Sequence, residues 1–289
     1  MAYAVTNRGH FGQRRWARRD RERQPQPQRP MAPSPQAGPV SDCPAGKLTG
    51  KVALIAGGDS GIGRAVAIAF AREGADIAIV YLNEHRGAEE TRRAIQRENV
   101  RCILVAEDTA SEGRCRRAIK RIIAAFGRLD ILVNNAAEQQ PQGQPSRDPR
   151  DVAPERREQT LRTNLLDMFY LTAAAMPHLR AGGAIINTTA VTAWRDSAYL
   201  IDDDATTATI ASFTRSLAEA LIARGIRANA VTPGPVGAPP IRGTFRSGSR
   251  WEYAPAFGKI APGYVSLAAE NDLFMTGQVV HAKAGETVA

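Results

Sequence analysis

The segment GGDSGIGR, from Gly57 to Arg64, contains the residue types and spacing that point most clearly to chemistry. Its glycines allow a tight turn and a close approach of the backbone to a ligand. The segment follows an apolar run and opens a helical pattern, whose N-terminal N–H groups and partial positive charge suit a pyrophosphate. A glycine-rich turn alone is weak evidence, but this context predicts a nucleotide site. The residues predicted to line the phosphates are Gly57, Ser60, Gly61, Ile62 and Gly63.

Three consecutive acids, Asp202, Asp203 and Asp204, stand just before a helical pattern that does not require them. With Glu138, Asp203 could form a pair of carboxylates whose mutual repulsion raises one pKa. Such a pair could supply an acid and a base for a dehydration, isomerisation or cyclisation, or hold a divalent metal. The alternative is that both residues are ordinary crevice surface. No histidine lies in this stretch, so we favour that alternative and predict no metal site.

The residues that could do chemistry lie within an alternation of short β-branched runs and helical patterns that starts near Lys47. Such an alternation is typical of a parallel sheet with helices on both faces. The expected strands span 52–57, 76–82, 101–108, 129–137, 184–190 and 226–234. The expected helices span 63–73, 84–98, 111–126, 154–179 and 206–224. The predicted fold class is a single Rossmann-type α/β domain with its site at the carboxyl ends of the strands.

Composition divides the chain into a leader and a body. The 289 residues carry a net charge of +9, and much of this excess belongs to arginines within the first 29 residues. Residues 1–46 are rich in Pro and Gln and lack a sustained apolar period, so we expect a disordered leader before a domain at 47–289. A basic arm could touch nucleic acid or an anionic membrane, but we favour a solvated leader.

The cysteine content and the hydropathy of the chain indicate the cellular compartment in which we expect the protein. The cysteines are Cys43, Cys102 and Cys115, an odd number without metal-ligand spacing. The chain has no apolar signal-peptide core and no run of about 18 apolar residues for a membrane span. We therefore expect a protein of the reducing cytoplasm.

The run GKVALIAGGDSGIGRAVAIAFAREGADIAIVYL, residues 50–82, resembles the opening of a short-chain dehydrogenase/reductase, with Ala56 in place of the threonine of its TGxxxGxG motif. Three later segments, LVNNAA, VTPGPVGAPP and TGQVVHAKAGE, extend the resemblance to roughly 47–285. The resemblance is strongest to the bacterial glucose-dehydrogenase-like and general-stress-protein-like subgroup. It implies an NAD(P) cofactor and a homodimer or homotetramer. The further cofactor contacts that it implies are Asp108, Asn134, Ala136, Pro233 and Gly234.

The same resemblance implies a catalytic tetrad of Asn, Ser, Tyr and Lys, of which this chain keeps the asparagine as Asn164. The Ser, Tyr and Lys positions hold Ala190, Asp203 and Thr207. Alanine has no hydrogen-bonding side chain, and threonine cannot supply a positive charge. The ordinary pKa of aspartate lies far below that of tyrosine, so an ionised Asp203 could not donate a proton to a carbonyl. Tyr199 is near, but no lysine follows it at the required spacing.

Three functional hypotheses follow. The first is a family member that binds NAD(P) but lacks the carbonyl-reduction machinery, as a pseudoenzyme or a repurposed protein. The second is an active oxidoreductase with a non-standard site, and the third is a non-redox lyase, isomerase or cyclase that uses Asp203 or Glu138. For the cofactor we lean towards NADP. NAD-selective members place an aspartate where this chain has Tyr81, and Arg64 or Arg86 could approach a 2′-phosphate, although we favour the interpretation that both are solvated helix residues.

Overall fold

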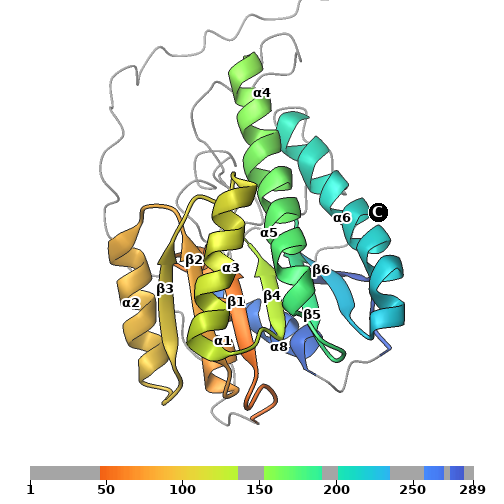
Figure 1. The fold of residues 1–289 in the computed structure, drawn as a ribbon. Coiled ribbons are helices and arrows are strands. Elements are labelled where there is room, and N and C mark those ends of the chain that lie inside the picture. The colour runs from red at the N-terminus through yellow and green to blue at the C-terminus, as the bar shows by residue number, and fades with distance from the viewer. Residues whose placement is uncertain (1–45, 136–152, 191–200, 235–256, 270–273, 283–289) are drawn as a thin grey trace, which may run out of the picture. The chain divides into compact units, whose positions relative to one another are not determined.

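A computed structural model describes residues 46–135, 153–190, 201–234, 257–269 and 274–282. Within them the chain forms a 7-stranded parallel sheet with the order β3-β2-β1-β4-β5-β6-β7 (Figure 1). This confirms the predicted doubly wound α/β fold. The strands are β1 Val52–Ala56, β2 Asp76–Tyr81, β3 Cys102–Ala106, β4 Ile131–Asn134, β5 Ala184–Thr188, β6 Arg227–Pro233 and β7 Val279–Ala282.

Helices cover both faces of the sheet (Figure 1). Buried residues of α1, α2 and α8 belong to one hydrophobic cluster, and those of α3, α5 and α6 belong to another. The bounds are α1 Gly61–Arg72, α2 His85–Gln96, α3 Glu112–Phe126, α4 Pro154–Leu161, α5 Asp167–Ala175, α6 Ile201–Leu221 and α8 Ala261–Ala268. Short helices are η2 Arg162–Leu166, η3 Met176–His178, η5 Ile222–Arg224 and η7 Phe257–Lys259.

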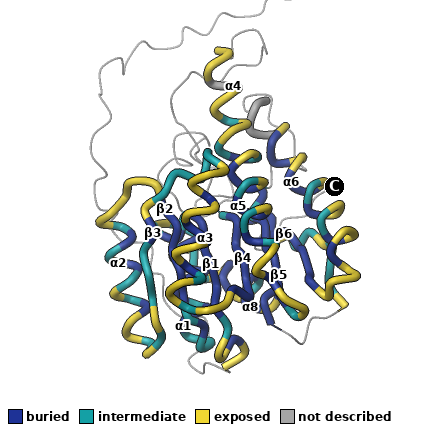
Figure 2. Tube along the Cα trace, in the orientation of Figure 1, coloured by how far each residue is buried: buried dark blue, intermediate teal, exposed yellow. Residues whose placement is uncertain are grey.

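Strand β1 shows why these apolar runs fold as central strands. Its five residues are all buried, and alternate side chains enter opposite clusters: Ala53 and Ile55 face α1, whereas Leu54 faces α3. This follows from the two-residue period of a strand, whose successive side chains point to opposite faces. In Figure 2 the central strands are accordingly buried, the edge strand β3 is mostly intermediate, and α4 is mostly exposed.

The helix expected over 154–179 differs from the prediction. The segment continues from α4 through a π-helical turn, η2, into α5, and it ends at η3. A π-turn inserts an extra residue into a helix and is frequent at functional sites. Asn164 lies in this turn. The hydrophobic pattern shows helix on both sides, but it does not reveal a single inserted residue.

Helix α6 begins at Ile201, before the predicted start at residue 206. The triplet Asp202–Asp204 therefore lies in its first turn rather than ahead of it. Acidic residues are favoured in a first turn because of the positive end of the helix dipole. Helix stability thus provides a reason for these acids that the sequence analysis did not consider.

Two described elements, α8 and β7, were not predicted. Helix α8 contains Pro262 and Gly263 close to its start, and both residues argue against a helix in a sequence pattern. Proline is nevertheless tolerated in a first turn. Strand β7 has four residues and pairs with β6 alone, so its pattern is too short to recognise. Among the described helices, none is long and apolar enough to cross a membrane.

Candidate dinucleotide site

The turn between β1 and α1 requires glycine at several places. Gly57 and Gly61 have φ angles of +70° and +53°, in the left-handed region that other residues rarely adopt. A Cβ on Gly63 would lie 2.0 Å from the carbonyl oxygen of Gly57, so no side chain fits there. Ser60 is the N-cap of α1 and makes no side-chain capping bond to the helix. The turn therefore places the N-terminus of α1 directly behind a closely approachable stretch of backbone, which fits a pyrophosphate.

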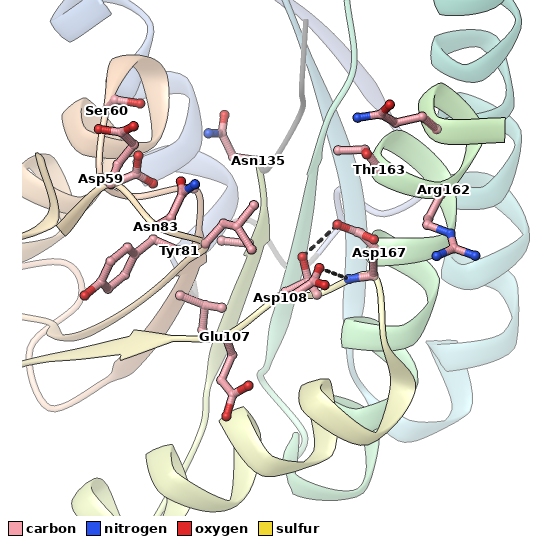
Figure 3. A pocket seen from close by; sticks show the side chains of 18 of the residues that line it. Asp59, Ser60, Tyr81, Asn83, Glu107, Asp108, Asn135, Arg162, Thr163 and Asp167 are labelled. Carbon is pink, nitrogen blue, oxygen red and sulfur yellow. Dashed lines mark hydrogen bonds between the residues drawn. The ribbon is translucent and has the colours of Figure 1, made fainter. Parts of the chain in front are cut away.

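A cleft of about 770 Å³ lies in front of this turn, at the carboxyl ends of the first four strands (Figure 3). One wall comes from the β1–α1 turn and from the residues that follow β2, β3 and β4. The other comes from α4, η2 and the start of α5. The sequence analysis placed the site at this edge of the sheet.

The lining of the cleft is rich in carboxylates. Among the described residues that line it, the guanidinium of Arg162 is accompanied by the acidic residues Asp59, Glu84, Glu107, Asp108, Glu155, Glu158 and Asp167. Such a lining disfavours anions wherever no N–H groups face them. The glycine turn is the part of the cleft that suits a pyrophosphate, because the helix N-terminus offers positive potential there.

Asp108, the residue predicted to meet an adenine ring, lies beyond the end of β3. Its Oδ1 accepts the backbone N–H of Ala110 at 3.0 Å, and its Oδ2 lies 3.5 Å from the guanidinium of Arg114. The next residue, Thr109, donates its hydroxyl to Oδ2 of Asp167 at 2.7 Å (Figure 3). Asp167 is the first residue of α5, and only 7% of its surface is exposed. This hydrogen bond joins the two walls of the cleft.

Cys115 lies beneath the same end of the cleft. Its thiol donates to the carbonyl oxygen of Thr109 at 3.2 Å. Burial raises the pKa of Cys115 to about 12, and the negative charges of Asp167 and Asp108 add to this effect. Burial also raises the pKa of Cys102 to about 12. Both residues are therefore unreactive thiols, and neither forms a disulfide.

The two asparagines that follow β4 point in different directions. Asn134 donates from Nδ2 to Thr172 at 3.0 Å and to Oδ1 of Asn187 at 2.9 Å, so its side chain lies in the core and not in the cleft. Asn135 is the residue whose side chain lines the cleft. The sequence analysis named Asn134 alone. Alternation of side chains along a strand is the signal that would have identified its neighbour.

A hydrogen-bond chain reaches Asn135 from the protein interior. Thr188 donates its hydroxyl to Oδ1 of Asn135 at 3.2 Å, and it lies 2.8 Å from the hydroxyl of Tyr264. Because Thr188 has a single hydroxyl proton, Tyr264 must be the donor to Thr188. Burial raises the pKa of Tyr264, which keeps its phenol protonated. No acceptor among the described residues takes a hydrogen bond from Nδ2 of Asn135, and this nitrogen lies beside the glycine turn at Gly63.

The predicted tetrad positions lie on η2, after β5 and on α6, and hydrogen bonds connect these three elements. Asn164 in η2 donates from Nδ2 to the hydroxyl of Thr206 at 3.2 Å. Thr189, beyond β5, donates its hydroxyl to the backbone carbonyl of Thr207 at 2.8 Å. Thr207 is 5% exposed, and Ala190 follows Thr189 directly. These two hydrogen bonds join asparagine, threonine and backbone atoms.

Arg64 is turned away from the cleft. Its Nε donates to the hydroxyl of Thr91 at 2.9 Å, and one terminal nitrogen donates to the carbonyl oxygens of Asp59 and Gly87 at 2.6 and 3.1 Å. This arginine therefore holds α2 against the glycine turn.

The residues at the end of β2 also differ from the expectation of a basic pocket. Tyr81 directs its hydroxyl to Nδ1 of His85 at 3.0 Å. The side chain of Arg86 is 93% exposed and pairs with Glu90. The neutral polar side chains that line this end of the cleft are Ser60 and Asn83 (Figure 3).

Comparison with known proteins decides the family. A profile described as enoyl-(acyl carrier protein) reductase matches residues 56–287. The chain belongs to the short-chain dehydrogenase/reductase family. It is 46% identical to uncharacterized oxidoreductase YhdF of Bacillus subtilis (strain 168), over 93% of this chain and 94% of that protein. It is 44% identical to general stress protein 39 of the same organism, over 92% of this chain and 94% of that protein. The predicted stress-protein-like subgroup is thereby confirmed.

A plant relative and solved structures give further similarities. NADPH-dependent aldehyde reductase 1 of Arabidopsis thaliana is 39% identical, over 92% of this chain and 96% of that protein. A short-chain dehydrogenase from Burkholderia cenocepacia J2315 in complex with NADP has a TM-score of 0.75 and 28% identity, over 83% of this chain and 98% of that one. One from Mycobacterium paratuberculosis bound to NAD has a TM-score of 0.73 and 26% identity, with the same coverage.

Several predicted residues of this short-chain dehydrogenase/reductase lie outside the described part or apart from the cleft. Asp203 belongs to α6 by its backbone, but its side chain is not described. Ala136, Glu138 and Tyr199 lie outside the described residues. Pro233 and Gly234 end and follow β6, and the N–H of Gly234 donates to Ala282 at 2.9 Å. Neither residue lines the described cleft. The predicted roles of all these residues remain predictions.

Proposed function

We propose that this short-chain dehydrogenase/reductase binds NAD(P), with a preference for NADP, and lacks the Ser/Tyr/Lys machinery for carbonyl reduction. It would act as a pseudoenzyme or as a repurposed member of the family. The observation that carries the proposal is Thr207. It stands at the lysine position, is buried, and has its backbone bound by Thr189.

The glycine turn and the cleft support the dinucleotide half of the proposal. The pyrophosphate would lie at Gly57, Gly61 and Gly63, where the backbone conformation and spacing exclude side chains. The amide of Asn135 would meet the central part of the ligand, and Asp108 would meet the adenine. The described residues thus fit the group that the family implies.

The preference for NADP is supported by relatives more than by charge. One solved relative is a complex with NADP, and the plant relative is named as NADPH-dependent. Arg64 and Arg86 are engaged elsewhere, so a 2′-phosphate would depend on neutral donors from Ser60 and Asn83. We therefore expect a modest preference.

The step that we propose is missing is the transfer of a proton to the carbonyl oxygen of a substrate. A bound NADPH supplies a hydride to a carbonyl carbon, and the protein must then supply a proton to the carbonyl oxygen. The family uses a phenol whose pKa is lowered by a nearby ammonium. Neither Ala190 nor Thr207 contributes a proton donor of that kind or a positive charge. Asp203 would be ionised at neutral pH at its ordinary pKa.

Binding and turnover test the two halves separately. Calorimetry should detect NADP or ADP-ribose, and Gly61→Asp should abolish the signal because it adds a negative charge and a strained φ at the pyrophosphate. With NADPH and a panel of aldehydes, ketones and quinones, the nicotinamide absorbance should not change. No binding to the wild type would refute the first half. Turnover that Asp203→Ala removes would refute the second.

We also propose a homodimer or homotetramer that uses α5 and α6. The side chains of Leu161, Leu166 and Phe169 are exposed along α4, η2 and α5, and Phe169 contacts Phe213 of α6 with ring centroids 5.5 Å apart. Packing on the sheet does not account for these exposed residues. We further place the protein in the cytoplasm, because the odd number of cysteines in the chain indicates a reducing compartment.

A further inference from the structure

We infer that Arg64 is a positioning residue of the proposed dinucleotide site, although it is not among the described residues that line the cleft. It fixes the peptide between Asp59 and Ser60 so that the carbonyl oxygen of Asp59 stays away from a bound pyrophosphate. The inference rests on the proposed function and deepens it, because it names the residue that prepares the glycine turn for an anion.

The guanidinium of Arg64 connects the glycine turn to helix α2 by three hydrogen bonds. Its Nη2 donates to the carbonyl oxygens of Asp59 and Gly87, at 2.6 and 3.1 Å. Its Nε donates to the hydroxyl of Thr91 at 2.9 Å, and that hydroxyl donates in turn to the carbonyl oxygen of Gly87 at 3.0 Å. Because Thr91 is fully buried, these bonds hold the guanidinium in one place.

The direction of the Asp59 carbonyl decides which group of this peptide can meet a ligand. Asp59 and Ser60 both line the cleft (Figure 3). In a planar trans peptide, the C=O group and the following N–H group point in opposite directions. The Asp59 oxygen is bound to Arg64, so the N–H of Ser60 is directed away from that guanidinium. Among the described residues, no backbone carbonyl accepts this N–H, so the donor is available to an anion.

The hydrogen bond to Asp59 matters because the turn could otherwise rotate easily. Gly58 and Gly61 flank the Asp59–Ser60 dipeptide, and glycine adopts positive and negative φ angles with little cost. A rotated peptide would turn its carbonyl oxygen towards the phosphates. Carbonyl and phosphate oxygens are both acceptors, so that orientation would weaken binding. The bond from Arg64 opposes the rotation.

The charge of Arg64 is partly compensated where it lies. The carboxylate of Glu90, on α2, is 3.6 Å from Nη2 of Arg64. A cation that is paired with a carboxylate attracts a more distant anion less than an unpaired cation does. We therefore assign Arg64 a geometric role rather than a direct attraction of the phosphates.

Gly87 gives independent support, because its position leaves room for this contact. A Cβ on Gly87 would lie 2.8 Å from the Asp59 oxygen and 3.3 Å from Nη2 of Arg64. Gly87 lies in helix α2 and its φ angle is not positive, so its backbone conformation does not require glycine. The carbonyl and the guanidinium themselves exclude a side chain there.

Calorimetric titration with ADP-ribose compares the wild type with Arg64→Met, which keeps an apolar stem and removes the donors. The affinity should fall by about tenfold, as expected for one weakened hydrogen bond to a charged ligand. Arg72→Met is the matched control, because Arg72 lies on the same helix, pairs with Glu98 and is 30% exposed, against 29% for Arg64. Its affinity should stay within about twofold of the wild type. Unchanged affinity in folded Arg64→Met would overturn the inference, whereas no binding to the wild type would contradict the dinucleotide proposal as well.

The amide resonance of Ser60 distinguishes positioning from general stabilisation. In nitrogen–proton correlation spectra, ADP-ribose should move the Ser60 amide proton of the wild type downfield, because its N–H would donate to a phosphate. The shift should be lost in Arg64→Met. An equal shift in both proteins would overturn the positioning role.

Arg64→Lys separates geometry from charge. Lysine keeps the positive charge, but its ammonium is a single point that cannot reproduce the fixed fork of a guanidinium. The affinity for ADP-ribose should therefore stay at least about threefold below that of the wild type. Full recovery in Arg64→Lys would show that the charge alone matters and would overturn the inference.

Gly87→Ala provides the same test from α2, should Arg64→Met fail to fold. The added Cβ must displace the Asp59 carbonyl or the guanidinium and so lower the affinity for ADP-ribose, although alanine suits a helix better than glycine. Gly113→Ala is the control, since nothing lies within 4 Å of its Cβ. A folded Gly87→Ala variant with wild-type affinity would contradict the role of Arg64.

Discussion

At the scale of single residues, the amide of Asn135 lines the cleft, and we propose that it meets the dinucleotide there. Its orientation follows from the hydrogen-bond chain that starts at Tyr264 and passes through Thr188. Buried donors cannot remain without acceptors at low cost, so this chain has one consistent direction. The donor that it leaves for the ligand is Nδ2 of Asn135.

Asn135→Asp tests this assignment with almost no change in shape. The substitution replaces a hydrogen-bond donor by a carboxylate beside the proposed pyrophosphate site. The carboxylate would also face the glycine turn, where the amide nitrogen packs in the wild type. The affinity for ADP-ribose should fall by about thirtyfold or more, corresponding to roughly 2 kcal/mol. Calorimetry checks it, with Thr188→Ser as the control that keeps the hydroxyl. An affinity within about threefold of the wild type would exclude Asn135 from the site.

The buried thiol of Cys115 gives a pH-dependent prediction. Its pKa is raised in the folded state, so its contribution to stability is present below the ordinary pKa of 9.0 and is lost as the pH rises towards about 12. The free energy of unfolding should therefore fall with pH in this window less steeply in Cys115→Ala than in the wild type. Urea titrations at several pH values measure both slopes. Equal slopes would contradict the assignment.

Residue identities were predictable from the sequence where a motif fixes them, and not where topology does. Gly57 and Gly61 of the first turn could be recognised from the sequence, because residues other than glycine rarely adopt their φ angles. Asp167 has no local signature. It reaches the cleft because α3 and α5 pack side by side, which brings it to Thr109, 58 residues away in the chain.

At the scale of elements, the β1–α1 unit forms the end of the cleft at which we propose the phosphates bind, and the continuous helical segment of α4, η2 and α5 forms the opposite wall. Gly63 is the point where α1 meets the turn most closely. A side chain there would collide with backbone rather than with a movable side chain. The shape of the turn therefore depends on this position.

Gly63→Ala should both weaken ligand binding and destabilise the fold. The added Cβ would lie 2.0 Å from the Gly57 oxygen, so the turn must shift, at a cost of at least about 2 kcal/mol. Gly113→Ala is the matched control, since nothing lies within 4 Å of its Cβ and alanine is the better helix former, by up to about 1 kcal/mol. Thermal and urea unfolding measure the stability of both variants relative to the wild type. A Gly63→Ala variant as stable as the wild type would show that the turn relaxes freely.

Element boundaries were harder to predict than element types. The start of α6 was missed because the acidic triplet reads as a loop, although acids are well suited to a first turn. The π-turn at Arg162–Leu166 leaves the hydrophobic pattern almost unchanged.

At the scale of the whole molecule, the parallel sheet with helices on both faces was implied by the alternation of strand and helix patterns, whereas the order of its strands was not predicted. Association between copies was implied only by the family. The exposed apolar side chains on α4, η2 and α5 form the surface through which we propose that the copies associate.

Phe169→Glu should dissociate the proposed oligomer. Phe169 is 51% exposed, and burying a charge in an apolar interface without a partner costs several kcal/mol. Light scattering coupled to size-exclusion chromatography should show the mass fall to that of one 31.1 kDa chain. Ile222→Glu, a change at another exposed apolar residue, is the control and should leave the mass unchanged. A monomeric wild type, or an unaffected variant, would contradict the proposed surface.

Loss of NADPH absorbance in the presence of an aldehyde panel tests the central claim most directly, when wild type is compared with a variant that carries Ala190→Ser, Asp203→Tyr and Thr207→Lys together. Both proteins should bind NADP in a parallel titration. We predict no turnover by the wild type, because it lacks a proton donor held beside a positive charge, and measurable turnover by the rebuilt variant. Steady turnover by the wild type, lost on rebuilding these three positions, would contradict the claim.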